Sequence, residues 1–128
     1  MSVDDRSVLG RAAMILNGFG DNQPSLTLNE LTNRCGLPRS TVHRFAEQLV
    51  AIGWLERASS GYRVGTRLFE VGSQAEQLNR LRAAAEPWMQ RLHETSRMCV
   101  HLAILDGSEV LYIDKITARD VNVPSRIG

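Results

Sequence analysis

Five side chains that could bind nucleic acid lie close together at the start of residues 38–52, a segment with helical spacing. They are Arg39, Ser40, Thr41, His43 and Arg44. Short hydroxyls at the start of a helix allow a close approach to DNA, and Arg44 could donate two hydrogen bonds to guanine. The helix N-terminus also favours a nearby phosphate. The segment therefore predicts a surface for the DNA major groove, with a solvated polar face as the alternative.

A metal site or a nucleophilic centre is the other chemistry to consider, and the sequence argues against both. Cys99 and His101 share a face of a predicted strand, and His93 falls on a predicted helix. A metal site would need a second closely spaced ligand pair, and a nucleophile would need an orienting carboxylate. We therefore expect no enzyme activity, no cofactor and no metal. Cys35 and Cys99 are expected to be reduced thiols.

The sequence predicts two helices before residues 38–52. Apolar residues recur at helical spacing from Ser7 to about Gly18, before a loop containing Gly and Pro. Thr27 and Glu30 have the spacing of a capping box, which predicts the start of a second helix. Gly36 is expected to end that helix in the left-handed conformation.

The third helix follows after a turn of two residues. Pro38 suits its first position, because the missing N–H of proline would be unpaired there. The predicted buried stripe consists of Val42, Phe45, Leu49 and Ile52. Glu47 lies on the opposite side with the candidate DNA-binding residues, and Gly53 ends the helix. Two helices joined by so short a turn are typical of a helix-turn-helix.

A hairpin is predicted directly after these helices. Residues 54–57 and 62–65 are short runs rich in aromatic and apolar residues, and residues 58–61 form a Ser/Gly loop between them. A hairpin in this place is a wing. Its tip carries Ser59 and Ser60, which are expected to reach the DNA backbone or the minor groove.

A helical pattern continues over residues 66–86 and predicts a linker helix. Its apolar stripe consists of Leu68, Val71, Ala75 and Leu78. The stripe could pack on its own winged helix or against a second copy of the chain. We favour a dimer, because a winged helix of about 65 residues has a marginal core. Pro87 is expected to interrupt the pattern, so a separate helix would start there.

The remaining segment, residues 87–128, reads as the start of a second domain. Residues 100–105 alternate like a strand, Asp106 and Gly107 suggest a turn, and residues 110–113 suggest a second strand of the same hairpin. Two strands cannot bury a face on their own. We therefore expect that the sequence is truncated within this domain.

Composition limits the classes of protein that remain. The 128 residues are 43% hydrophobic and 23% charged, with a net charge of +1, which argues against a disordered chain and a strongly basic tail protein. No apolar run approaches the roughly 20 residues that a bilayer span needs. The first residues lack the pattern of a signal peptide. We expect a cytoplasmic protein with no membrane partner.

An ordered set of motifs resembles the IclR family of bacterial transcription regulators. The first part is Leu28-x-x-Leu31 followed by Cys35-Gly36-Leu37-Pro38-x-Ser40-Thr41-Val42-x-Arg44, and the second is Gly61-Tyr62-Arg63-Val64-Gly65. Residues 87–92, 100–107, 110–114 and 124–128 are similar to the opening of that family's effector-binding domain. The resemblance covers almost the whole chain.

The resemblance implies an N-terminal winged helix, a linker helix and a C-terminal α/β domain of GAF-like topology. It implies repressors or activators that form dimers and often tetramers, and that bind small organic or aromatic acids. It carries DNA contact to Arg39, Ser40, Thr41 and Arg44, and wing contact to Arg63, while His43 occupies a variable position of the reading face. The chain departs from the family because most of the effector-binding part is absent, so no effector-binding residue can be named.

We predict a mainly α chain with a β-wing. Residues 1–65 would form a winged helix-turn-helix, 66–86 a linker and dimerisation helix, and 87–128 an incomplete α/β (GAF-like) effector domain. The predicted function is sequence-specific, dimeric transcriptional regulation at a palindromic DNA operator, responsive to a ligand when full length. The expected DNA contacts are Thr27, Arg39, Ser40, Thr41, His43, Arg44, Ser59, Ser60 and Arg63. The alternatives are a winged helix that contacts only proteins, and an enzyme or ligand sensor in the α/β part.

Overall fold

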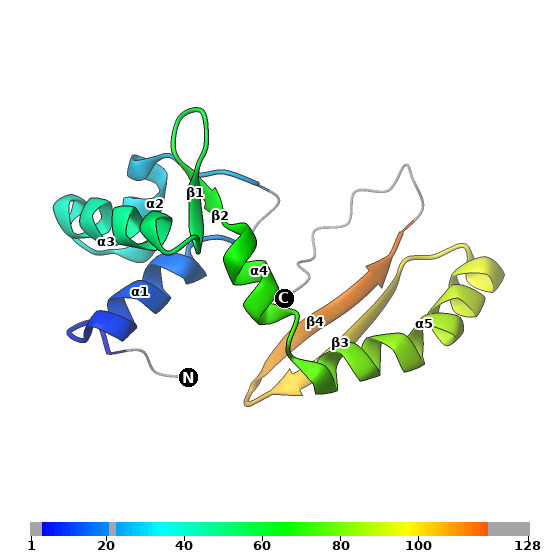
Figure 1. The fold of residues 1–128 in the computed structure, drawn as a ribbon. Helices are drawn as coiled ribbons and strands as arrows, with labels where there is room; N and C mark the ends of the chain where they lie inside the picture. Colours follow the sequence, from blue (N-terminus) through cyan, green and yellow to red (C-terminus); the bar gives the residue numbers. More distant parts are fainter. Residues whose placement is uncertain (1–3, 21–22, 118–128) are drawn as a thin grey trace. The chain divides into compact units, whose positions relative to one another are not determined.

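The chain forms two compact units, Met1–Gln74 and Ala75–Gly128. A computed structural model describes residues 4–20 and 23–117, so the motif at residues 124–128 lies outside the described residues. Within the described residues, the first unit contains four helices and a small hairpin, and the second contains one long helix and a longer hairpin (Figure 1).

The first three helices of the first unit are α1 (Val8–Asn17), α2 (Leu28–Cys35) and α3 (Arg39–Ala51). The predicted capping box is confirmed, because Thr27 Oγ1 accepts from the Glu30 N–H and Glu30 Oε1 accepts from the Thr27 N–H. Gly36 is left-handed, with φ of 72°, and ends α2 as predicted. The expectation for Pro38 was one position wrong. With ψ of 143°, Pro38 is extended and precedes the first helical residue.

The core of the first unit lies between these helices and the hairpin. Its buried side chains are Ile15, Leu26, Leu31, Cys35, Val42, Phe45, Ala46, Leu49, Leu55 and Tyr62. Three of the four predicted α3 positions are confirmed, but Ile52 is 55% exposed and Ala46 is buried instead. Because α3 ends at Ala51, Ile52 no longer follows helical spacing. The Trp54 N–H then bonds back to the Leu49 carbonyl and turns the chain away.

The predicted wing consists of β1 (Leu55–Arg57) and β2 (Tyr62–Val64), which pair antiparallel. An isolated bridge between Leu26 and Tyr62 ties the hairpin to the segment before α2, with N···O distances of 2.8 and 2.9 Å. Gly61 is required at this contact, since a Cβ there would stand 2.0 Å from the Leu26 carbonyl oxygen. The wing is therefore fixed at its base by backbone contacts.

The predicted linker helix is divided at a different place from the one expected. α4 covers Thr66–Gly72 and α5 covers Glu76–Ser96, so the break falls between them, and α5 continues through Pro87. A helical proline removes one backbone hydrogen bond and strains the preceding turn. Here the packing of α5 on the hairpin offsets that cost. Arg82 donates to the Ile113 carbonyl at 3.1 Å, and Met89 is buried.

The second unit has α5 packed on an antiparallel hairpin (Figure 1). The strands are β3 (Val100–Asp106) and β4 (Glu109–Ile116), which confirms the predicted hairpin. Asp106 pairs with Glu109, so the two-residue turn is formed by Gly107, with φ of 63°, and Ser108. A register shift lies between Leu102 and Ala103, opposite Ile113, which is the buried residue of β4.

Candidate nucleic-acid interface

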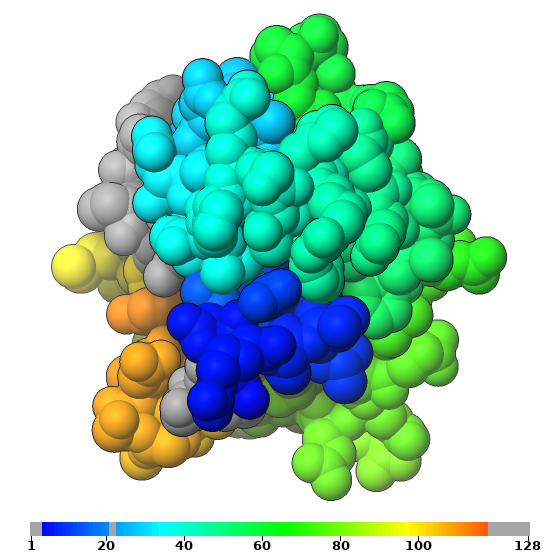
Figure 2. Space-filling view, turned by 90° about the vertical axis from the view of Figure 1, so that its left-hand side faces the viewer, coloured from blue at the N-terminus to red at the C-terminus, as the bar shows by residue number. Residues whose placement is uncertain are grey.

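The exposed side of α3 carries the polar residues that the sequence singled out. Arg39, Ser40, His43 and Arg44 are exposed, and Thr41 is half-buried. Figure 2 shows this part of the surface, with α2 and α3 in cyan to teal, α1 in blue and the wing in green. Arg39 Nε donates to Asn29 Oδ1 at 2.9 Å, which joins the start of α3 to α2. The first turns of α3 therefore present two arginines beside short hydroxyls.

Arg44 is the most available cation on this side of α3. Its guanidinium carbon lies 5.5 Å from the centre of the Phe45 ring, and the part of the chain that the structure describes provides no carboxylate partner for it. A guanidinium in this state keeps all its N–H donors for an external acceptor. The geometry suits either a phosphate or the edge of a guanine.

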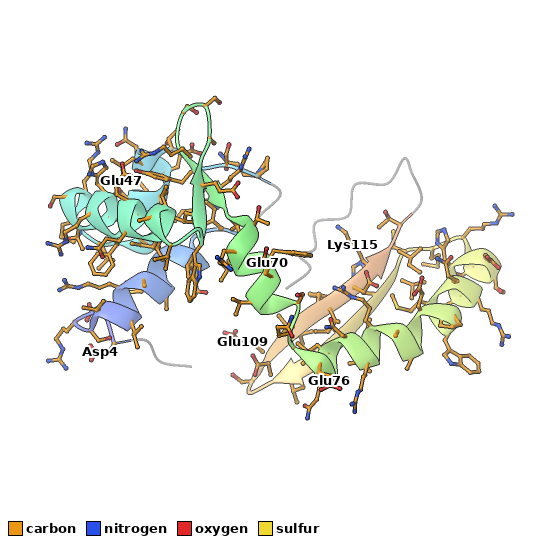
Figure 3. All side chains as sticks on the ribbon, in the orientation of Figure 1. Asp4, Glu47, Glu70, Glu76, Glu109 and Lys115 are labelled. Carbon is orange, nitrogen blue, oxygen red and sulfur yellow. The ribbon has the colours of Figure 1, made fainter. Side chains whose placement is uncertain are left out.

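Glu47 is the one acidic residue on the described part of α3, and Arg57 neutralises it. Figure 3 labels Glu47, whose side chain extends from α3. Arg57, at the end of β1, donates from Nη1 to Oε1 at 2.8 Å, and its Nη2 lies 2.6 Å from Oε2. Hydrogen bonding to Glu47 raises the pKa of Arg57. His43 Nε2 lies 3.5 Å from Oε1 of the same carboxylate. The pairing of Arg57 with Glu47 could not be predicted from the sequence, because the two residues lie ten positions apart on different elements.

The wing presents two kinds of predicted contact. Ser59 and Ser60 are exposed at its tip, where the Ala58 N–H donates to the Gly61 carbonyl at 2.8 Å. Arg63 is also exposed, but its Nε donates to Glu56 Oε2 at 3.1 Å on the opposite strand. A phosphate would therefore compete with Glu56 for this arginine or share it.

Glu56 also caps the next helix. Its Oε1 accepts from the Thr66 N–H at 3.0 Å and from the Thr66 hydroxyl at 2.9 Å, at the start of α4. These hydrogen bonds, led by the backbone one and joined by that from Arg63, lower the pKa of Glu56. One carboxylate thus connects the wing to α4. This link was not visible in the sequence, because it depends on the pairing register of β1 and β2.

Thr27, the remaining predicted DNA contact, belongs to the cap of α2. It is half-buried, and its hydroxyl oxygen accepts from the Glu30 N–H at 3.2 Å. The hydrogen bonds from Thr27, with a further one from Gln23, lower the pKa of Glu30. The structure thus gives Thr27 a clear role in starting α2, and its contact with DNA stays a prediction.

The four residues predicted for dimerisation do not form one helical stripe. Leu68 and Val71 lie on α4, Leu78 lies on α5, and Ala75 is the residue that precedes α5. Val71 is exposed, and Leu68 and Leu78 are half-buried. Phe69, which was not predicted, is 74% exposed and is the largest apolar side chain that α4 offers to solvent.

The rejected chemical sites have ordinary surroundings. His93 Nδ1 lies 2.9 Å from the Met98 carbonyl oxygen, and the ring of His101 meets the edge of Tyr112 with centroids 5.3 Å apart. Cys35 and Cys99 are both free thiols. Within residues 4–20 and 23–117, no three His, Cys, Asp or Glu side chains are grouped to hold a metal ion. None of the helices described is long and apolar enough to cross a membrane.

The fold and the exposed side of α3 define a winged helix-turn-helix protein of the kind that binds DNA. Residues 8–59 match the IclR helix-turn-helix domain, and residues 74–128 match the bacterial transcriptional regulator IclR C-terminal domain. The chain belongs to the IclR family, whose members are DNA-binding transcriptional regulators. The predicted family and fold class are confirmed.

Curated relatives agree with this placement. The chain is 36% identical to the HTH-type transcriptional regulator KipR of Bacillus subtilis over 96 residues, which cover 74% of this chain and 38% of that protein. It is 31% identical to the HTH-type transcriptional regulator XynR of Escherichia coli, over 92% of this chain and 48% of that protein. The chain thus spans less than half the length of these relatives.

Solved structures give the same result for the fold. An IclR homolog from Microbacterium hydrocarbonoxydans, complexed with 4-hydroxybenzoate, matches with a TM-score of 0.79 and 31% identity, over 94% of this chain and 53% of that one. An IclR-type regulator from Silicibacter matches with a TM-score of 0.75 at 19% identity, over 94% of this chain and 51% of that one, and supports the fold alone.

Proposed function

We propose that this chain is the DNA-binding part of a transcriptional regulator that reads a palindromic operator as a dimer. The observation that carries the proposal is the exposed first half of α3, where Arg39 and Arg44 flank Ser40 and Thr41 and the acidic charge of Glu47 is already neutralised. In this binding mode α3 enters the major groove. Ser59, Ser60 and Arg63 meet the backbone or minor groove from the wing, and His43 contributes to sequence preference. Regulation takes place in the cytoplasm.

Selection from a randomised duplex pool, followed by titration at two salt concentrations, tests this function. The expected result is enrichment of a palindrome whose complex survives salt better than bulk DNA binding does. Arg44→Ala should lower operator affinity by about 1–3 kcal/mol and relax specificity at one base position. A folded chain that binds no DNA at either salt concentration would favour the alternative of a winged helix that contacts only proteins.

The dimer and the effector belong to the same proposal. We assign the dimer contact to Leu68, Val71, Ala75 and Leu78, and the exposed Phe69 supports an apolar surface on α4. Sedimentation equilibrium of the wild-type chain and of Val71→Asp tests it, with a monomeric variant as the expected result. By analogy with the homolog that binds 4-hydroxybenzoate, the complete regulator would respond to a small organic or aromatic acid. We also propose a functional division into residues 1–65 for DNA binding, 66–86 for linkage and dimerisation, and 87–128 as the start of the effector domain.

A further inference from the structure

A depression of about 290 Å³ lies between α3 and the wing. Its lining includes His43 and Glu47 from α3, Arg57 and Ser60 from the hairpin, and Leu28 from α2. Both neighbouring elements, α3 and the wing, belong to the proposed DNA interface. The depression therefore lies where a DNA strand would pass from one element to the other.

The two charged groups of the depression are exposed to different degrees. The Arg57 side chain is 64% exposed, whereas the Glu47 side chain is 30% exposed. A guanidinium carries five N–H donors in one plane. Arg57 Nη1 donates a hydrogen bond to Glu47 Oε1, and Nη2 lies 2.6 Å from Oε2 as an ion pair without a second hydrogen bond, so the remaining donors stay available for a second acceptor.

The stability that this pair provides does not explain its geometry. A surface ion pair contributes about 0–1 kcal/mol, and the side-chain entropy lost in forming it offsets part of that. One hydrogen bond from Nη1, together with the close approach of Nη2 to the second carboxylate oxygen, restricts the orientation of the guanidinium plane. Glu47 can therefore hold Arg57 in one direction, as a preorganised contact requires.

We propose that Arg57 is a further DNA-binding residue that contacts a backbone phosphate, and that Glu47 is its positioning residue. The inference rests on the proposed DNA-binding function and adds a residue to the DNA contacts predicted from the sequence. The phosphate would take the free donors of Arg57, while Glu47 remains bound to the other edge. Because Arg57 cancels the charge of Glu47, this side of α3 keeps its attraction for DNA.

Salt titration of Arg57→Gln tests the phosphate contact. The whole chain is titrated with the duplex enriched from the random pool and with a random duplex of the same length. Loss of one phosphate contact should reduce the slope of log affinity against log salt by about 0.9, and should weaken operator binding by roughly tenfold. Arg80→Gln is the matched control, because Arg80 also pairs with a carboxylate, that of Glu76, but lies on α5 in the second unit. An unchanged slope for Arg57→Gln would overturn the assignment.

The sign of the effect of Glu47→Gln tests the positioning role. Removal of a negative charge alone would tighten binding, as simple electrostatics requires for any carboxylate near DNA. Loss of a positioning residue should instead weaken operator binding by roughly threefold or more. Glu47→Asp separates geometry from charge, because it keeps the charge and withdraws the carboxylate by one methylene, so it should weaken binding as well. Glu94→Gln, on α5, controls for the change in net charge.

The outcomes separate this inference from the proposed function. Tighter operator binding by Glu47→Gln, or unchanged binding by Glu47→Asp, would show that Glu47 does not position Arg57 for DNA binding. If the wild-type chain enriches an operator but Arg57→Gln keeps its salt slope, the phosphate contact of Arg57 is wrong and the proposed function still holds. If the folded wild-type chain binds neither duplex, both the proposed DNA-binding function and the phosphate contact of Arg57 are wrong. Thermal unfolding of every variant confirms that the folded chain is being compared.

Discussion

Replacement of Gly61 by alanine should destabilise the first unit, although it adds one methyl group. The new Cβ would lie 2.0 Å from the Leu26 carbonyl oxygen and 2.7 Å from the Leu26 carbonyl carbon and the Thr27 Cα. All three atoms belong to the backbone, so no side chain can rotate to make room. The wing must therefore move away from the segment that precedes α2.

The cost can be worked from the contacts that such a movement breaks. The bridge consists of two backbone hydrogen bonds, from the Leu26 N–H to the Tyr62 carbonyl and from the Tyr62 N–H to the Leu26 carbonyl. Each contributes about 1 kcal/mol net. Leu26 and Tyr62 are both buried, so their partial exposure adds to the loss. We expect a decrease of about 2–4 kcal/mol in the free energy of unfolding.

Urea denaturation followed by circular dichroism measures this change. Gly72→Ala is the matched control, because a Cβ there would meet nothing within 4 Å and the residue lies at the end of α4. That variant should be neutral or stabilising by up to about 1 kcal/mol. If Gly61→Ala unfolds within about 0.5 kcal/mol of the wild-type chain, the close approach at the base of the wing is not the constraint described here.

Two further predictions concern the core and the response to acid. Leu31 is fully buried, so Leu31→Ala should lower the free energy of unfolding by about 2–5 kcal/mol. Leu9→Ala, at an exposed position of α1, should change it by less than about 0.5 kcal/mol. Equal effects of the two substitutions in the same urea assay would contradict the assigned core. Hydrogen bonds lower the pKa of both Glu30 and Glu56 from the ordinary value of 4.5. Their stabilising contribution is therefore complete above that value and is lost as pH falls through the lowered folded-state pKa. Thermal unfolding between about pH 6 and pH 3 should show a falling midpoint that Glu56→Gln makes shallower, and an identical decline in the variant would refute the role of Glu56.

Local signals allowed most of the first unit to be predicted from the sequence. The Thr27–Glu30 cap and Gly36 act within four residues of the element that they delimit, so their effect does not depend on tertiary structure. The buried positions of α3 followed from helical spacing as far as Leu49. The prediction failed at Ile52 because the helix had already ended, and spacing alone does not reveal the last helical residue.

The linker region shows the opposite case. Gly72 ends α4, but the apolar pattern on either side of it appeared continuous, so the break was missed. Pro87 is a strong local signal for a break, yet α5 continues through it. The packing of α5 on the hairpin, with the Arg82–Ile113 hydrogen bond before Pro87 and the buried Met89 after it, holds the helix together. Tertiary packing can override a local preference of this size.

The polar pairs of the candidate interface could not be predicted from the sequence. Glu47 with Arg57, and Glu56 with Arg63 and Thr66, each join residues from different elements. Opposite charges are common on any surface, and only the strand register and the packing of α3 select these partners. The sequence did indicate which arginines were present, and the structure shows that Arg44 has no carboxylate partner among the described residues.

The carboxylate of Glu56 also has a consequence for how such regulators diverge and can be recombined. Residues 58–60 at the wing tip can be exchanged without touching Glu56, Arg63 or Thr66, so the DNA preference of the tip can change while these three contacts and Gly61 are kept. A graft that replaces the whole hairpin must carry all three positions together, because a foreign residue at position 56 would release both the opposite strand and the start of α4. Among relatives, positions 56, 63 and 66 should therefore change as a set, whereas residues 58–60 of the loop should vary independently of them.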